Sequence, residues 1–331
     1  METFLTTLTQ MLTLFTFIAI GFTLTKTKIL PDSASKVMAK LETWILLPSL
    51  SFMAMLRYCT IESLATHGTN IILSGIILVI AILIAIFLSR LFVKEKGIER
   101  GVYVYGLTIA NISYIGDPIV IALFGEQALA YYKLFCLPLL IFIYTIGISL
   151  MIPKSDKKGT SIKRLLNPTA IALFIGVILG LLNAENYIPK FLISTLDSAK
   201  ACVAPIAMLL AGVTIARFDF IKMLKNIKVY VASILRLIVI PTILVALLFG
   251  IVTLVNHLFN FNIGYDVLFL CFFAYCPPLG LNSVVFPEAY GGNPETGASM
   301  ALISHTICVI TIPMLYMLMV ALFGVPFTAL I

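Results

Sequence analysis

Long apolar runs follow one another along the whole chain, and short polar connectors separate them. An apolar run of about 18 or more residues can cross the hydrocarbon core of a bilayer as a helix. Residues 71–93 and 229–254 are two such runs. A transmembrane β-barrel would show short alternating segments instead. The pattern therefore predicts an all-α polytopic membrane protein.

The runs predict about ten transmembrane helices. We place them near residues 8–25, 37–56, 71–93, 102–124, 128–152, 167–182, 199–216, 229–254, 267–289 and 296–323. Composition agrees, because 61% of the residues are hydrophobic and 11% are charged, whereas soluble domains carry about 25% charged residues. Asn167 and Pro168 predict the N-cap and first helical position of the sixth span.

Lysine and arginine residues concentrate in every second connector, with the densest group at residues 154–164. The positive-inside rule then predicts that both termini lie on the non-cytoplasmic side of a cell (inner) membrane. The first run has no basic segment before it and no small-residue cleavage site after it, so we expect a retained span. The net charge of +7 is explained by orientation of the spans in the lipid bilayer, and we expect no nucleic-acid partner.

The fourth and ninth runs are interrupted. Polar and helix-breaking residues crowd between Asn111 and Pro118. Pro118 cannot donate a backbone hydrogen bond and disfavours helical backbone at Asp117, so a break is predicted there. Pro277 and Pro278 predict a second break. Free backbone groups at this depth must be buried in protein or face water, and secondary transporters use such breaks as substrate sites.

Landmarks of residues 1–165 recur in residues 166–331. Pro31 and Pro48 precede the first break at nearly the spacing at which Pro189 and Pro205 precede the second. Five spans in each half is an odd number, so the second half enters the membrane from the opposite side. The sequence thus predicts a 5+5 inverted repeat in which the broken spans four and nine cross near the pseudo-two-fold axis.

The order and spacing of these segments resemble the auxin efflux carrier family in its compact malonate/malate carrier form, within the group that includes the bile acid:sodium symporters. The matching segments are Ile29-Leu-Pro31, Leu47-Pro48-Ser49-Leu50, Asn111 to Glu126, Asn167-Pro168, Ala204-Pro205 to Gly212, Pro277-Pro278 to Asn282 and Tyr290-Gly291-Gly292. The resemblance implies a scaffold domain and a transport domain, each drawn from both repeats. It also implies elevator-like efflux or exchange of small organic anions, and a homodimer.

In plant relatives, an asparagine on each crossing helix holds the substrate carboxylate, and the resemblance assigns this role to Asn111 and Asn282. An amide can donate to a carboxylate without adding a buried charge, although hydrogen bonding between helices is the alternative role. The helix starts expected after Pro118 and Pro278 would favour an anion. The full predicted substrate site comprises Asn111, Ile112, Pro118, Pro277, Pro278 and Asn282.

Charged residues inside the runs are candidates for ion coupling. Asp117 departs from the family pattern, in which an apolar residue often precedes the proline, and it could couple transport to H⁺ or Na⁺ or cap a half-helix. Glu42 is the second coupling candidate, with snorkelling to the interface as its alternative. Arg236 and Lys133 could attract anions or pair with acids, but we expect both to be interfacial anchors. For His305 we expect a packing role, with a proton relay as the alternative.

Other functions fit the sequence less well. Gly116-Asp117 and Tyr265-Asp266 superficially resemble the motifs of an intramembrane aspartyl protease, but their order is reversed and Asp266 falls at the outer end of its span. A channel would need a continuous polar stripe, which spans three and six lack. A sodium-coupled importer on the same fold is the main alternative. No CxxC motif is present among the six cysteines, so we expect them to have no metal or disulfide role. For a transporter we expect no cofactor and no enzymatic activity.

Overall fold

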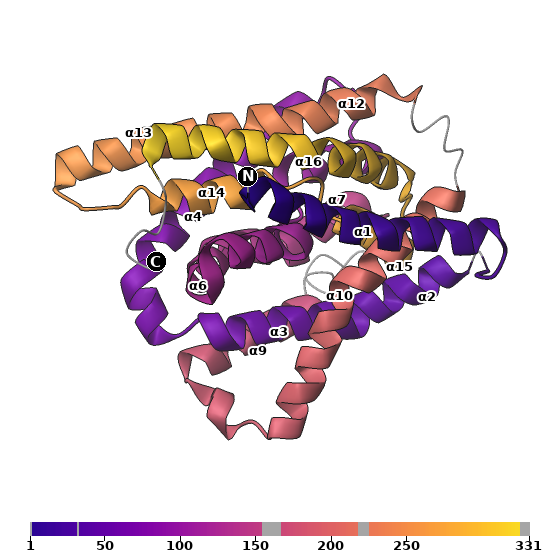
Figure 1. The fold of residues 1–331 in the computed structure, drawn as a ribbon, viewed down its shortest axis with the longest axis horizontal. Coiled ribbons are helices and arrows are strands. Elements are labelled where there is room, and N and C mark those ends of the chain that lie inside the picture. Colours follow the sequence, from indigo (N-terminus) through magenta and orange to yellow (C-terminus); the bar gives the residue numbers. More distant parts are fainter. Residues whose placement is uncertain (1, 32, 154–166, 218–224, 325–331) are drawn as a thin grey trace.

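A computed structural model describes residues 2–31, 33–153, 167–217 and 225–324 (Figure 1). These ranges are helical and contain no β-strand, which confirms the all-α prediction. The α-helices are α1 (Glu2–Lys26), α2 (Ala34–Leu41), α3 (Leu47–Tyr58), α4 (Ile61–Ser89), α5 (Ile98–Thr108), α6 (Asp117–Phe142), α7 (Ile148–Met151), α9 (Pro168–Leu181), α10 (Lys190–Arg217), α12 (Ile227–Ile234), α13 (Ile240–Phe259), α14 (Asp266–Tyr275), α15 (Asn282–Tyr290) and α16 (Glu295–Phe323). The basic connector at 154–164 and the predicted repeat boundary at 165/166 lie outside the described residues.

Six continuous helical stretches in the described ranges are long and apolar enough to cross a membrane. They are Ala34–Tyr58, His67–Ser89, Ala128–Met151, Lys190–Arg217, Ile227–Phe259 and Glu295–Phe323. Shorter apolar helices occur at Phe15–Lys26, Pro168–Leu181 and Asp266–Tyr275. The multi-pass character is thereby supported, whereas the ten-span 5+5 repeat stays a prediction.

Short π-helical turns join several of these helices into longer ones. They are η1 (Glu42–Leu46), η2 (Ile112–Gly116), η3 (Ile143–Gly147) and η5 (Leu235–Val239). Turns of this type are rare and occur frequently at functional sites. Here η1 and η5 carry the buried charged residues Glu42 and Arg236.

Local sequence signals explain two helix boundaries. The Asn167 side-chain oxygen accepts a hydrogen bond from the Ala170 N–H at 2.9 Å, so the predicted N-cap is confirmed. Within α6, Gly125 has φ +81° and interrupts the helical geometry. Because glycine adopts positive φ without a steric penalty, this residue separates the end of the fourth run from the fifth.

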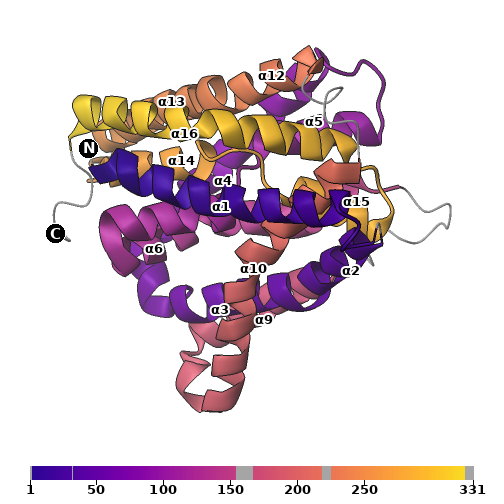
Figure 2. The ribbon, with the colours of Figure 1, turned by 45° about the vertical axis from the view of Figure 1, so that its right-hand side comes forward.

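The helices pack as two groups. The first group contains α1, α2, α3, α9 and α10: α1 lies along α10, and α3 packs against α9 and α10. Gly212 of α10 lies where a Cβ atom would come within 2.0 Å of the Ile18 carbonyl oxygen of α1, so this close approach requires glycine. The second group contains α4 to α7 and α12 to α16, with α4 packed on α5 and α6, and α12 on α16. Figure 2 shows α3, α9 and α10 on the opposite side of the molecule from α12 and α13.

Polar contacts connect the two groups at α15. Glu288 of α15 is buried, and its Oε1 atom accepts hydrogen bonds from Ser35 Oγ at 2.6 Å and from Arg217 Nη1 at 2.7 Å. Ser35 belongs to α2 and Arg217 ends α10, so one carboxylate of the second group binds two helices of the first. The turn η1 also contacts α15.

Candidate functional site

The two helix interruptions meet inside the second group. Ala110, between α5 and η2, forms an isolated antiparallel bridge with Leu279, between α14 and α15. The Asn111 N–H donates to the Pro278 carbonyl at 2.8 Å. Backbone groups released by a helix break need partners at membrane depth. The two breaks provide these partners for each other, and the prediction that they lie together is confirmed.

The first break does not lie at Pro118. Helix α5 ends at Thr108 with extended backbone at Ile109, and helical turns resume at Ile112. The Asn111 carbonyl accepts hydrogen bonds from the N–H groups of Ile115 and Gly116, so this residue starts the second half-helix. Pro118 lies inside the continuous half-helix η2–α6, directly after the π-helical turn η2, and the helix passes through it without a break.

The second break lies where the sequence predicts it. Helix α14 ends at Tyr275, residues 276–281 are irregular and include Pro277 and Pro278, and α15 starts at Asn282. Among the predicted substrate residues, Asn111, Ile112, Pro278 and Asn282 are therefore at or beside the crossing. Pro118 is displaced along α6.

Side chains from neighbouring helices bind the remaining backbone groups. The Tyr132 hydroxyl lies 3.1 Å from the Phe273 carbonyl oxygen and 3.3 Å from that of Ile112, so it donates to both halves of the crossing. Ser304 Oγ accepts from the Leu279 N–H at 3.2 Å. A Cβ atom at Gly116 would come within 2.3 Å of the Tyr132 hydroxyl, so glycine is required for this approach.

Asn111 is 2% exposed, and its side chain contacts His305 of α16. The Asn111 Nδ2 atom lies 3.2 Å from His305 Nε2, and His305 Nδ1 lies 2.6 Å from the Ala301 carbonyl oxygen. Because a carbonyl accepts only, Nδ1 carries the proton in the neutral ring, and Nε2 accepts from the asparagine. His305 is therefore more than a packing residue, since it orients the Asn111 amide.

A cavity of about 20 Å³ lies directly at the crossing. It is lined by the first residues of both half-helices and by residues of α3 and the α6–η3 segment: Ala110, Asn111, Ile112, Ser113, Gly280, Leu281 and Asn282, with Leu47, Leu50, Leu140, Ile143 and Tyr144. This volume accommodates roughly one water molecule. Two helix N-termini, each with a partial positive charge, thus face one buried space.

Three charged residues are buried more deeply than the sequence suggests. Lys133 of α6 is 4% exposed and forms an ion pair with Asp117, so the expected interfacial anchor is wrong. Arg236 is 0% exposed and is likewise no interfacial anchor. Glu42 is 0% exposed, which excludes snorkelling, and neither carboxylate oxygen has a hydrogen-bond partner among the described residues.

Sequence reasoning underestimated the residues that support the crossing. Tyr132, Ser304 and His305 are separated from the breaks along the chain, and no motif marks them. Arg236 and Lys133 carried a usable signal, because a cation inside an apolar run rarely faces lipid and usually faces a protein interior.

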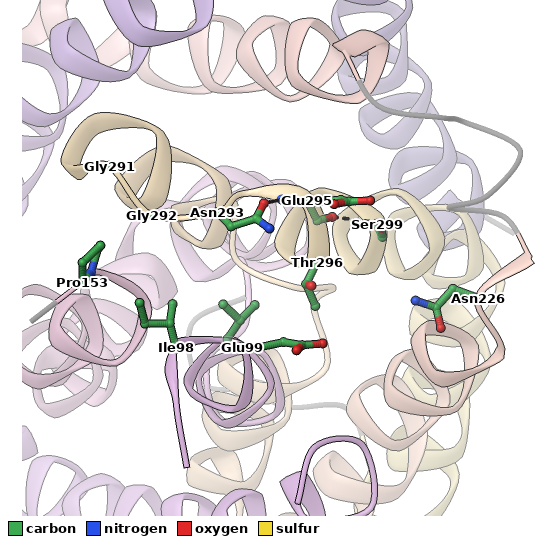
Figure 3. A pocket seen from close by; sticks show the side chains of 11 residues that line it. Ile98, Glu99, Pro153, Asn226, Gly291, Gly292, Asn293, Glu295, Thr296 and Ser299 are labelled. Carbon is green, nitrogen blue, oxygen red and sulfur yellow. Dashed lines mark hydrogen bonds between the residues drawn. The ribbon is translucent and has the colours of Figure 1, made fainter. Parts of the chain in front are cut away.

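A larger pocket of about 550 Å³ lies apart from the crossing and shares no lining residue with its cavity. Figure 3 shows Glu99 of α5 beside Thr296, and Glu295 at the start of α16, with Asn226 across the opening. Among the described residues that line this pocket, none is basic. The carboxylates of Glu99 and Glu295 disfavour the binding of an anion, so we do not place the substrate site in this pocket.

Metal binding has no support in the part of the chain that the structure describes. No group of three or more histidine, cysteine, aspartate or glutamate side chains is placed to hold an ion there. The six cysteines are free thiols, and five of them are buried. In these ranges they pack as small apolar residues.

Apolar helices around two interrupted helices that exchange backbone hydrogen bonds are an arrangement found in membrane transporters. Comparison with known families gives the same class. The family model described as membrane transport protein matches residues 6–316, so the chain belongs to this family, the auxin efflux carrier family. A comparison with curated proteins found no match. Membership in a transporter family favours transport over the protease alternative.

Proposed function

We propose that the protein is a secondary active transporter that moves small organic anions, carboxylates in particular, across the cell membrane by efflux or exchange. One observation carries this proposal: two half-helix N-termini, with Asn111 and Asn282, face one buried cavity. Unpaired N–H groups and the helix dipole at such ends favour a negative charge. The amides of both asparagines can donate to a carboxylate without competing with it as anions.

The packing supports an elevator-type movement. Leu47 and Leu50 of the first helix group form one wall of the cavity, whereas the half-helices belong to the second group. Because the cavity has room for only about one water molecule, loading requires the two groups to separate. In this proposal α4 to α7 and α12 to α16 carry the site past a static scaffold of α1 to α3, α9 and α10. The lysine and arginine pattern supports an orientation with both termini on the non-cytoplasmic side.

Glu42 and Asp117 are the proposed coupling groups. A buried carboxylate without a partner is strongly disfavoured as an anion, so Glu42 is suited to hold a proton. Its turn η1 contacts α15 of the moving group, so protonation can respond to the movement. Asp117 is paired with Lys133 in this conformation, and its coupling role requires that pair to open.

The test is uptake of labelled malonate or malate by proteoliposomes under imposed pH or sodium gradients. We expect Asn111→Ala and Asn282→Ala to reduce flux at least about 10-fold, because each removes a donor to a charged group. Asn70→Ala, at a half-buried asparagine of α4, serves as the matched control and should transport normally. Normal flux in both site variants would exclude the crossing as the substrate site. Flux driven by sodium but not by pH would favour the importer alternative.

A further inference from the structure

Arg236 is a buried cation in the middle of the long helical stretch Ile227–Phe259. None of its three guanidinium nitrogens has a hydrogen-bond partner among the described residues. An arginine brings five N–H donors and a permanent charge, and burial of both without partners is strongly unfavourable. A charge buried in this way calls for an anionic partner that compensates it.

Arg236 lies beside the crossing. Its turn η5 packs against α5 and α16, the helices that precede the first break and support Asn111. The side chains that act on it most strongly are Cys276, Tyr275 and Tyr105. Cys276 begins the second break, two positions before the Pro278 carbonyl that binds Asn111.

Other buried polar atoms without partners surround the same position. The hydroxyl groups of Tyr105 and Tyr275 have no hydrogen-bond partner among the described residues, and the same holds for Asn282 Oδ1. Tyr105 is close enough to both Arg236 and Asn282 to interact with each of them. None of the side chains with the strongest electrostatic effect on Arg236 is an aspartate or a glutamate. Among the described residues, the surroundings of Arg236 thus combine a positive charge with several hydrogen-bond donors.

We propose that Arg236 is the fixed positive charge of the substrate site and that its guanidinium pairs with a carboxylate of the transported anion in the loaded state. This inference rests on the proposed function, because it requires an organic anion at the crossing. A guanidinium presents two parallel N–H groups to a carboxylate and is the side chain best matched to it. The hydroxyls of Tyr105 and Tyr275 supply further donors. When the anion binds, it compensates the buried charge of Arg236 and accepts hydrogen bonds from these donors.

A binding measurement on the purified full-length protein tests this role. Thermal unfolding in detergent is followed against sodium malonate, with sodium chloride at equal ionic strength as the reference. We expect wild-type protein to show saturable stabilisation by malonate. Arg236→Gln should need at least about 30-fold more malonate, because loss of one partner of a buried charge pair weakens binding by this factor or more. Arg90→Gln, at an exposed arginine after α4, is the matched control and should bind as wild type.

Two further readouts separate recognition from a structural role. Without malonate, Arg236→Gln should unfold at a temperature equal to or above that of the wild type, because an uncompensated buried charge is removed. Arg236→Lys keeps the positive charge but loses the two parallel N–H groups that match a carboxylate. The affinity of this variant for malonate should therefore fall about 10-fold. If Arg236→Gln does not fold, the malonate affinity of Arg236→Lys tests the inference in its place.

Each outcome has a defined meaning. Equal malonate affinity in wild type and Arg236→Gln would overturn the inference and leave the proposed function intact. A lower unfolding temperature with unchanged malonate affinity would assign Arg236 to neutralising the C-terminal ends of α5 and α14, which also overturns the inference. If neither malonate, malate, acetate nor benzoate stabilises the wild type, the proposed substrate class and the inference both fail.

Discussion

His305 Nε2 accepts a hydrogen bond from Asn111 Nδ2 across 3.2 Å, and these residues stand 194 positions apart in the chain. The contact joins α16 to the start of the half-helix η2–α6. Because His305 Nδ1 is bound to the Ala301 carbonyl, the ring cannot rotate without losing a hydrogen bond. The amide of Asn111 is therefore held in one orientation at the crossing.

We expect His305→Leu to raise the KM for the transported anion about 3- to 10-fold, which corresponds to the loss of one neutral hydrogen bond. His305→Gln, whose side-chain oxygen can still accept from Asn111, should have a smaller effect. Initial rates in proteoliposomes over a range of substrate concentrations measure KM and the maximal rate separately. The exposed His257 of α13 gives a control in His257→Leu. An unchanged KM in His305→Leu would mean that Asn111 needs no support from this ring.

Glu42→Gln should abolish accumulation driven by a pH gradient while exchange of anion for anion continues. Glutamine has nearly the same shape as protonated glutamate but cannot release a proton. Accumulation under an imposed pH gradient and counterflow at equal pH on both sides measure the two activities. Glu95→Gln, at an exposed position, should behave as wild type. Retained pH-driven accumulation in Glu42→Gln would remove this residue from the coupling mechanism.

Single substitutions in the Asp117–Lys133 pair should destabilise the folded protein strongly. The double substitution should destabilise it by less than the two single losses together. Lys133→Met leaves the buried Asp117 carboxylate uncompensated, which should lower the free energy of unfolding by roughly 3 kcal/mol. In Asp117→Asn/Lys133→Met both charges are absent, so the loss should be smaller than the sum of the two single losses. Denaturant unfolding in detergent measures these energies. Additive losses would show that the pair does not couple in the folded protein.

Asp117→Asn also tests the proposed coupling role. If Asp117 contributes to coupling, this variant should lose part of the dependence of flux on the gradient, since a neutral amide cannot exchange Lys133 for an ion. Flux with and without the gradient is compared at equal amounts of reconstituted protein. Full gradient dependence in Asp117→Asn would make the carboxylate a structural partner of Lys133.

Gly116→Ala should lower the free energy of unfolding by about 1–3 kcal/mol, because a methyl group would be forced against the Tyr132 hydroxyl. Tyr132→Phe removes the clashing oxygen at the expense of its bonds to the Phe273 and Ile112 carbonyls. The double variant should therefore be more stable than the sum of the single changes predicts. Gly68→Ala on α4 is the control, since a Cβ there meets no atom within 4 Å. A loss in the double variant equal to the sum of the two single losses would exclude the clash as the cause.

The sequence and the structure differ on where the first helix ends, and the reason is physical. Pro118 marks a position that cannot donate a backbone hydrogen bond, and here the π-helical turn η2 directly before it lets the helix continue through the proline. The break lies earlier because the backbone of Ala110 and Asn111 finds partners in Leu279 and Pro278. Those partners are far away in the chain, so no local rule could reveal them.

Properties that follow from local chemistry were determined by the sequence alone. Run length and hydrophobicity establish a helical multi-pass membrane protein, the Asn167 side chain caps its helix, and Pro277 and Pro278 interrupt theirs. The environments of Glu42, Arg236 and His305 were decided only by the tertiary structure. Whether a polar side chain faces lipid, a partner or a closed interior depends on helix rotation and on which helices pack against it. The sequence of an apolar run does not determine how its helix is rotated. The packing of helices that are distant in the chain fixes this rotation.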